Sequence, residues 1–343
     1  MNRKRFIRSA SALFASFPFG SRQLQSPNDK TEDQQFIIPE YLKRGDTIGI
    51  TSPAGYITLE EITPATRQME GWGFKLKIGE SIGKRLFTFG GTDEERRIDF
   101  QNMLDDPSIK AIMCARGGYG FLRIIDQLKF EKFRSKPKWI IGFSDLTVLH
   151  SHLIRNYKIA SLHSKMCNSF PEDWNKAELI QVETILSIRR ALSGEKLQYS
   201  AIPNEKNRLG NAEGILVGGN LKTLESLAGS KSDLNTDGKI LFVEDTGEYL
   251  YSIDRMFWNL KRTGKLSGLR GLIVGGFKVK PDDPGEEFAL SVQEIVLEKV
   301  RASKFPVCFD FPVGHQKNNF AIKCGVKHLL KVEPREVVLK EII

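Results

Sequence analysis

The residues best suited to chemistry are Ser144 and Asp145, which directly follow the apolar run 139–143. After them, apolar residues recur at helical spacing. The run has the composition of a buried strand, and the spacing after it predicts a helix. A serine at a sharp turn from strand to helix exposes its hydroxyl above a sheet, next to the free N–H groups of the first helical turn. This placement is typical of an acyl-transfer nucleophile. Because Ser and Asp are also preferred helix caps, a purely structural cap is the alternative for this segment alone.

Two further candidates lie at predicted strand ends in the second half of the chain. Glu244 ends the apolar run 239–243, and His315 follows residues 311–314. A serine hydroxyl is a poor nucleophile at neutral pH and needs an adjacent base, a task that suits histidine. A carboxylate that accepts the other ring N–H fixes the tautomer and stabilises the imidazolium. Ser144, His315 and Glu244 would supply all three roles.

Two alternatives remain open at this point. His163 is a rival base, because it follows Ser144 closely in the chain. Side chains alternate across a strand, so Glu244 and Asp245 cannot both point into one site. The sequence does not say which of the two faces the histidine.

A glycine-rich turn follows the predicted strand 110–115. Gly117 and Gly118 would let the backbone approach a ligand closely, and its N–H groups could stabilise an oxyanion or hold a phosphate. The segment is not a dinucleotide-binding fingerprint, since the third glycine is missing. Arg116 and Tyr119 flank these glycines and are candidate substrate-binding residues. The structural alternative is a tight connection between strand and helix.

The elements that must position these residues alternate between strand and helix. Strands are predicted at 46–51, 74–78, 110–115 and 138–143, and helices at 59–72, 93–104 and 121–128. This alternation favours a mostly parallel sheet covered by helices, so residues 36–165 are expected to form an α/β domain. Residues 166–210 are expected to connect it, through a helix at 177–192, to a second domain at 211–343. That domain has predicted strands at 214–220, 239–243, 271–277, 307–309, 329–332 and 336–339.

The composition excludes several function classes. The formal net charge is +9, but residues 1–25 hold five basic and no acidic residues, which leaves +4 for the rest. No basic stripe is interleaved with aromatic residues, so a nucleic-acid partner is not expected. The four cysteines form no C-x-x-C pair, and neither a metal nor another cofactor is predicted. A cysteine hydrolase that uses Cys114 is disfavoured, because a cysteine inside an apolar strand is usually inert.

Residues 1–25 have the pattern of a signal peptide. Basic residues precede a stretch, 9–19, that is rich in small and apolar side chains. The start resembles a twin-arginine export motif with Lys4 in place of the second arginine. The segment is too short and polar to span a bilayer permanently, so export to the periplasm is the expectation. The alternative is a basic tail on a cytoplasmic protein.

Taken together, the motifs resemble those of the serine L,D-carboxypeptidase family. They occur in the family's order over roughly residues 36–340. The motifs are residues 89–96, 111–120, 142–145, 243–245 with 253–255, and 314–315. The resemblance implies Ser144 as nucleophile, His315 as base and Glu244 as its partner. It also implies an oxyanion hole formed by the backbone N–H of Asp145 and of Gly117 or Gly118.

The same resemblance implies an α/β fold with an N-terminal flavodoxin-like domain and a C-terminal swivelling β/α domain. The active site would lie between them, commonly in a homodimer. The expected activity is removal of the C-terminal D-alanine from peptidoglycan tetrapeptides through an acyl-enzyme. A same-family alternative is cleavage of a peptidyl or aminoacyl nucleotide antibiotic of the microcin C type. A different class is a non-catalytic, two-lobed ligand-binding protein. Export would depart from the cytoplasmic recycling role usual for the family.

Overall fold

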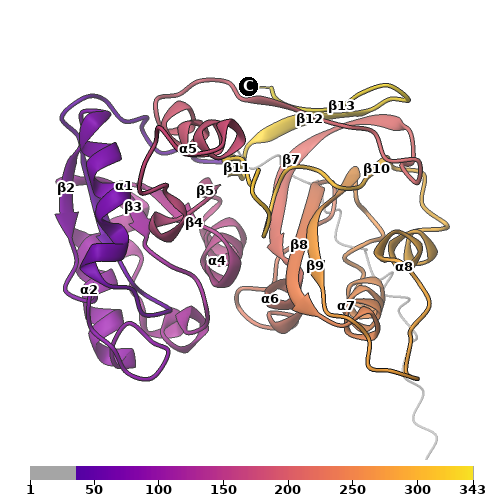
Figure 1. Cartoon of the computed structure of the whole chain (residues 1–343), viewed down its shortest axis with the longest axis horizontal. Coiled ribbons are helices and arrows are strands. Elements are labelled where there is room, and N and C mark those ends of the chain that lie inside the picture. Colours follow the sequence, from indigo (N-terminus) through magenta and orange to yellow (C-terminus); the bar gives the residue numbers. More distant parts are fainter. Residues whose placement is uncertain (1–35, 343) are drawn as a thin grey trace, which may run out of the picture. The chain divides into compact units, whose positions relative to one another are not determined.

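The computed structural model describes residues 36–342, whose strands form two sheets (Figure 1). The expected signal peptide at 1–25 lies outside the described residues. Within 36–342, no helix combines the length and the apolar character that crossing a membrane requires.

The first sheet is parallel except at one edge. Its strands, in spatial order, are β2 (Lys75–Ile78), β1 (Thr47–Thr51), β3 (Ile109–Cys114), β4 (Trp139–Gly142), β5 (Ser161–His163) and β11 (Ile322–Cys324). The first five are parallel, and β11 runs antiparallel to β5. The order 2-1-3-4-5 is that of flavodoxin-like folds, so the expected fold of the N-terminal half is confirmed.

Helices cover both faces of this sheet. They are α1 (Leu59–Gly71), α2 (Asp93–Asp105), α3 (Glu131–Ser135), α4 (Thr147–Tyr157) and α5 (Leu179–Leu192), with short 3₁₀ turns η1 (Phe121–Arg123), η2 (Ile125–Gln127), η3 (Ser144–Leu146) and η4 (Cys167–Ser169). Capping boxes start α1 and α2, because Thr58 and Thr92 each exchange hydrogen bonds with a glutamate three residues later. The α2 helix packs on β1 and β3, and α4 packs on β5.

The alternation of side chains along each strand divides the core into two clusters. In β3, Ile112 and Cys114 point into one buried cluster, whereas Ala111 and Met113 point into the other. The second of these clusters continues into the other sheet through residues such as Phe242. Strands buried on both faces read as continuous apolar runs, which is why the sequence identifies them.

The second sheet joins a parallel half to an antiparallel half. Its order is β10 (Val307–Cys308), β9 (Gly271–Val279), β8 (Ile240–Glu248), β7 (Gly210–Asn220), β12 (Lys327–Val332), β13 (Val337–Glu341) and β6 (Gln198–Ala201). Strands β7 to β10 are parallel, and β12, β13 and β6 are antiparallel. Three helices follow strands β7, β8 and β9 in turn along the chain: α6 (Leu221–Ser226), α7 (Leu250–Arg262) and α8 (Val292–Lys299).

Several elements differ from expectation. The predicted helix at 121–128 is instead the two turns η1 and η2, which follow Gly120, whose φ is 144°. The three-residue strands β5 and β11 and the helices α3 and α8 were not predicted. Two segments cross the expected boundaries: β6, from the expected connector, joins the second sheet, and β11, from the expected second domain, joins the first.

Candidate active site

Ser144 occupies a strained turn between β4 and α4. The backbone is extended at Phe143 and then turns into the left-handed region at Ser144, whose φ is 63°. Non-glycine residues seldom adopt this conformation, and they are enriched at functional sites where the surroundings hold them in place. Gly142 allows the turn to be tight, because a Cβ there would lie 3.1 Å from Cγ of Leu146. The half-buried serine thus has the geometry of a nucleophile elbow.

His315 lies between Ser144 and Glu244. Its Nε2 is 3.2 Å from Oγ of Ser144, and its Nδ1 is 2.5 Å from Oε2 of Glu244. The backbone N–H of His315 also donates to Oε2 of Glu244, at 3.2 Å. Gly314, with a φ of 103°, must be glycine here, because a Cβ would collide with the side chain of Glu244. Asn319 Oδ1 fixes the same loop by accepting the N–H of Gly314 at 2.7 Å.

Of the two acidic residues left open by the sequence, Glu244 is the one that contacts the histidine. Its side chain is fully buried. Asp245 turns the other way and accepts from Nδ2 of Asn220 and from the N–H of Lys222, both at 2.9 Å. Burial raises the pKa of Asp245 to about 6.

His163, the rival base, is fully buried in β5. Its ring packs edge-on against Phe242 and Phe143, at centroid distances of 5.0 and 5.7 Å. Burial holds the pKa of His163 well below its usual value. His315, not His163, occupies the position next to Ser144.

The glycine turn after β3 lies against the serine. A Cβ on Gly117 would be 3.2 Å from Cβ and 3.4 Å from Oγ of Ser144. The carbonyl oxygen of Gly117 accepts the N–H of Gly55 at 2.8 Å, which ties this turn to the loop after β1. Gly118 has a φ of 90° and lines the same pocket as Ser144 and Asp145. The turn can therefore bring its backbone close to a group bound at the serine.

Two buried side chains, those of Asp145 and Arg96, form hydrogen bonds with the backbone at the end of the glycine turn. The carboxylate of Asp145 accepts the N–H of Phe121 at 2.7 Å. Burial raises the pKa of Asp145 to about 6, and hydrogen bonds from the backbones of Phe121 and Gly120 oppose that rise. Arg96 Nη1 donates to the carbonyl oxygens of Pro53 and Gly120, at 2.6 and 2.9 Å. Arg96 belongs to a motif quoted above, but nothing in the sequence revealed this role.

The two substrate-binding candidates take different positions. Tyr119 is 53% exposed and lines the pocket beside Ser144. Arg116 is exposed, and its Nη1 donates to the carbonyl oxygen of Tyr56 at 3.1 Å.

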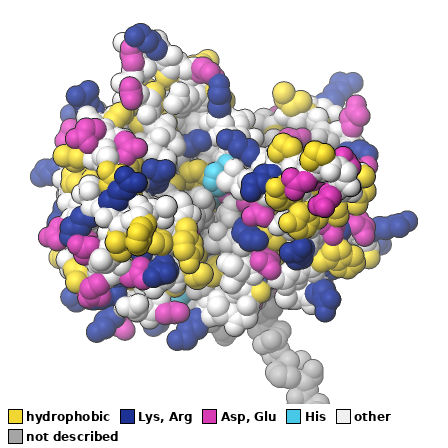
Figure 2. All heavy atoms as spheres, turned by 60° about the horizontal axis from the view of Figure 1, so that its bottom comes forward, with side chains coloured by type: hydrophobic (Ala, Val, Ile, Leu, Met, Phe, Trp, Pro, Cys, Tyr) yellow, Lys and Arg dark blue, Asp and Glu magenta, His cyan; other side chains and the backbone are white. Residues whose placement is uncertain are grey.

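The pocket beside Ser144 has a volume of about 380 Å³. Its lining also includes Asn220 at the end of β7, Lys222 in α6 and Thr246 in β8, three residues that the sequence did not predict for the site. On the side of the molecule drawn in Figure 2, a histidine side chain lies in a hollow of the surface, with Lys and Arg side chains around it. Among the histidines of residues 36–342, His315 alone is not buried.

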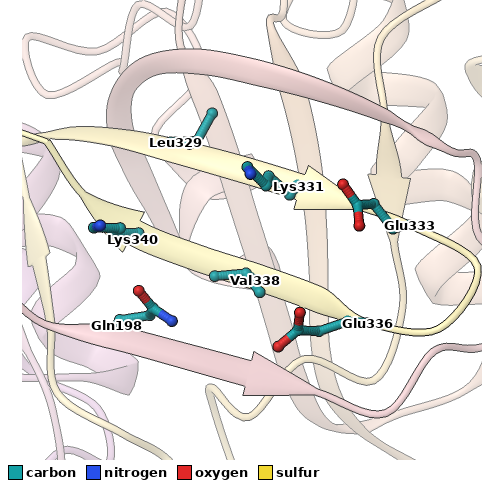
Figure 3. Close-up of a pocket in the computed structure, with 7 residues that line it drawn as sticks. All are labelled: Gln198, Leu329, Lys331, Glu333, Glu336, Val338 and Lys340. Carbon is teal, nitrogen blue, oxygen red and sulfur yellow. The ribbon is translucent and has the colours of Figure 1, made fainter.

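A second hollow, of about 250 Å³, lies on strands β6, β12 and β13 (Figure 3). Its lining includes Lys331, Lys340 and Glu336 but none of the residues predicted for the site.

In the part of the chain that the structure describes, no three His, Cys, Asp or Glu side chains are grouped to hold a metal ion. Cys114 is fully buried, and this burial raises the pKa of its thiol.

Comparisons with known proteins agree with this architecture. Residues 48–164 match the family model of the LD-carboxypeptidase N-terminal domain, and residues 213–330 match that of the C-terminal domain. A probable murein peptide carboxypeptidase of Bacillus subtilis is 30% identical over 308 residues, covering 88% of this chain and 94% of its own. The microcin C7 self-immunity protein MccF of Escherichia coli is 26% identical over 335 residues, covering 89% and 96%. The crystal structure of muramoyltetrapeptide carboxypeptidase from Oxalobacter formigenes superposes with a TM-score of 0.75 at 25% identity, covering 86% and 98%.

Proposed function

We propose that this chain, which belongs to the LD-carboxypeptidase family, is a serine peptidase that removes the C-terminal D-alanine from peptidoglycan tetrapeptides. The observation that carries the proposal is the position of His315, within hydrogen-bond distance of both Ser144 and Glu244. The names of its relatives, a murein peptide carboxypeptidase and a muramoyltetrapeptide carboxypeptidase, support the substrate class.

In the proposed first half-reaction, Ser144 Oγ attacks the carbonyl carbon of the last peptide bond. His315 Nε2 takes the proton of the hydroxyl, while Glu244 accepts the Nδ1–H and stabilises the imidazolium. Backbone N–H groups of Asp145 and of Gly117 or Gly118 stabilise the negative oxygen of the tetrahedral intermediate. His315 then protonates the leaving amine, and D-alanine departs.

In the second half-reaction, water attacks the acyl-enzyme. His315 takes a proton from this water and returns it to Oγ of Ser144 as the tripeptide leaves. No step requires a metal ion, so turnover should survive chelation.

The test is to incubate the protein with a disaccharide tetrapeptide in the presence of EDTA and to follow the products by mass spectrometry. The proposal predicts loss of one alanine and no further cleavage. An unchanged tetrapeptide, or activity that EDTA removes and zinc restores, would contradict it.

The likeness to MccF favours a second substrate class, a peptidyl or aminoacyl nucleotide. The same serine chemistry would serve it, so the two substrates are compared at equal enzyme concentration by kcat/KM. A preference for the nucleotide would replace the peptidoglycan proposal.

The homodimer that the family resemblance implies also stays a prediction. The molar mass measured by light scattering tests it.

A further inference from the structure

Lys165 is a partly buried cation next to the proposed catalytic base. It follows β5, and its Nζ donates to the carbonyl oxygen of Gln316 at 2.7 Å. The same Nζ lies 5.8 Å from the centre of the Phe143 ring, and that ring lies 4.9 Å from the ring of His315. Lys165 therefore belongs to the immediate surroundings of His315.

The ammonium group of Lys165 has no ion-pair partner among residues 36–342. The nearby acid is Glu244, whose Oε2 is already engaged by His315. Burial and the like charge of Lys278 lower the pKa of Lys165 to about 8, whereas Glu244 raises it. An ammonium group has three N–H donors, and the Gln316 carbonyl occupies one. A desolvated cation of this kind is stabilised by an anion that supplies the missing contacts.

The proposed reaction brings such an anion close to His315. His315 must protonate the leaving amine, so the departing amino acid lies beside Nε2 of His315. One carbon atom separates that amine from the α-carboxylate of the same amino acid. The terminal carboxylate must therefore also lie close to His315, on the side of the leaving group.

Arg116 and Lys222 are less suited to this carboxylate. The exposed Arg116 donates to the carbonyl oxygen of Tyr56. Lys222 lines the pocket on the Asp245 side, and its Nζ is 3.9 Å from the carboxylate of Glu248. Lys165 combines proximity to His315 with the lack of a carboxylate partner among the described residues.

We infer that Lys165 binds the C-terminal carboxylate of the leaving amino acid and so makes the enzyme select peptides that end in a free acid. The inference rests on the proposed function and deepens it, because it assigns the group that distinguishes a carboxypeptidase from an endopeptidase.

The test compares two tetrapeptides that differ only in a C-terminal carboxylate or carboxamide. Wild-type protein should prefer the free acid by kcat/KM. Lys165→Gln removes the charge but keeps a donor for the Gln316 carbonyl, and it should lower kcat/KM for the acid by roughly 10- to 100-fold. The same variant should leave kcat/KM for the carboxamide unchanged, and Lys165→Arg should keep the preference for the acid.

The matched control is Lys317→Met, two positions after His315. Lys317 is exposed and pairs with Glu178, so its loss should not alter the ratio of the two substrates. Lys165→Met repeats the test if the glutamine variant unfolds, as judged by thermal melting. Equal losses on acid and carboxamide, or a wild type without preference, would overturn this inference alone. A wild type that cleaves neither peptide would overturn the proposed function and the inference with it.

Discussion

Asp145 and Phe121 are joined by a hydrogen bond of 2.7 Å from the backbone N–H of Phe121 to the buried Asp145 carboxylate. The residue directly after Ser144 thereby holds the end of the glycine turn that packs against Ser144. The turn and the serine come from neighbouring strands, β3 and β4. The proposed nucleophile and the proposed oxyanion hole are therefore positioned by the same contact.

Replacing Asp145 by Ala should damage both stability and catalysis. The buried N–H of Phe121 would lose its acceptor, which costs about 1–3 kcal/mol of unfolding free energy. A displaced turn should lower kcat by roughly 10²-fold, since errors of about 1 Å have effects of that size. Asp145→Asn keeps one acceptor oxygen and should lose less of both. Denaturant unfolding and steady-state kinetics measure these effects, and an alanine variant with wild-type kcat would show that the contact is dispensable.

Gly117→Ala should reduce kcat without unfolding the protein. The new Cβ would lie 3.2 Å from Cβ of Ser144 and 3.3 Å from Cε of Met166, so the serine or the turn must shift. Gly71→Ala, at a site with nothing within 4 Å of the added carbon, is the control and should behave as wild type. Equal kinetics for the two variants would argue against a close approach of the turn to the reacting group.

The sequence predicts the elements that are long and apolar, and it fails where the structure depends on distant contacts. The strand 138–143 could be recognised because a strand buried on both faces is a continuous apolar run, and the helix after it could be recognised from the spacing of its apolar residues. The three-residue strands β5 and β11 are too short for any periodicity.

Ser144, Glu244 and His315, which the sequence singles out, lie together in the structure, whereas the contacts that hold them in place were not predicted. Side-chain alternation limits the choice between Glu244 and Asp245, but the register of β8 on β9 shifts between Val243 and Asp245, a bulge that the sequence does not reveal. Lys165 and Gln316 are 151 residues apart, so no local pattern predicts their contact.

The preference for a free acid should depend on pH through Lys165. Lysine is charged below its pKa, so kcat/KM for the free acid should fall as pH rises through about 8, the pKa set by burial and Lys278. The bound carboxylate favours the charged form, so the corresponding fall in kcat should occur at higher pH. The carboxamide should show neither fall. Parallel pH profiles for the two peptides, or a Lys165→Gln variant that keeps the difference, would contradict this assignment.

Export is predicted from residues 1–25. A reporter fused behind residues 1–30 should leave the cytoplasm, because a basic start is followed by a stretch of small and apolar residues. Replacing Arg3, Lys4 and Arg5 by glutamine should retain the reporter in the cytoplasm. Cell fractionation measures both. A wild-type fusion that stays in the cytoplasm would contradict export and would favour the cytoplasmic recycling role that is usual for the family.

The role of Ser144 as nucleophile is tested by comparing the turnover of disaccharide tetrapeptide by Ser144→Ala and by the wild type, with thermal melting as the check on folding. Only a hydroxyl group is removed, so the variant should melt as the wild type does. Loss of the nucleophile of a triad lowers kcat on the order of 10⁶-fold. Wild-type protein should release one alanine, and the folded variant should release none above background. A folded Ser144→Ala protein that still releases more than a small fraction of the alanine would contradict the role of Ser144 as nucleophile.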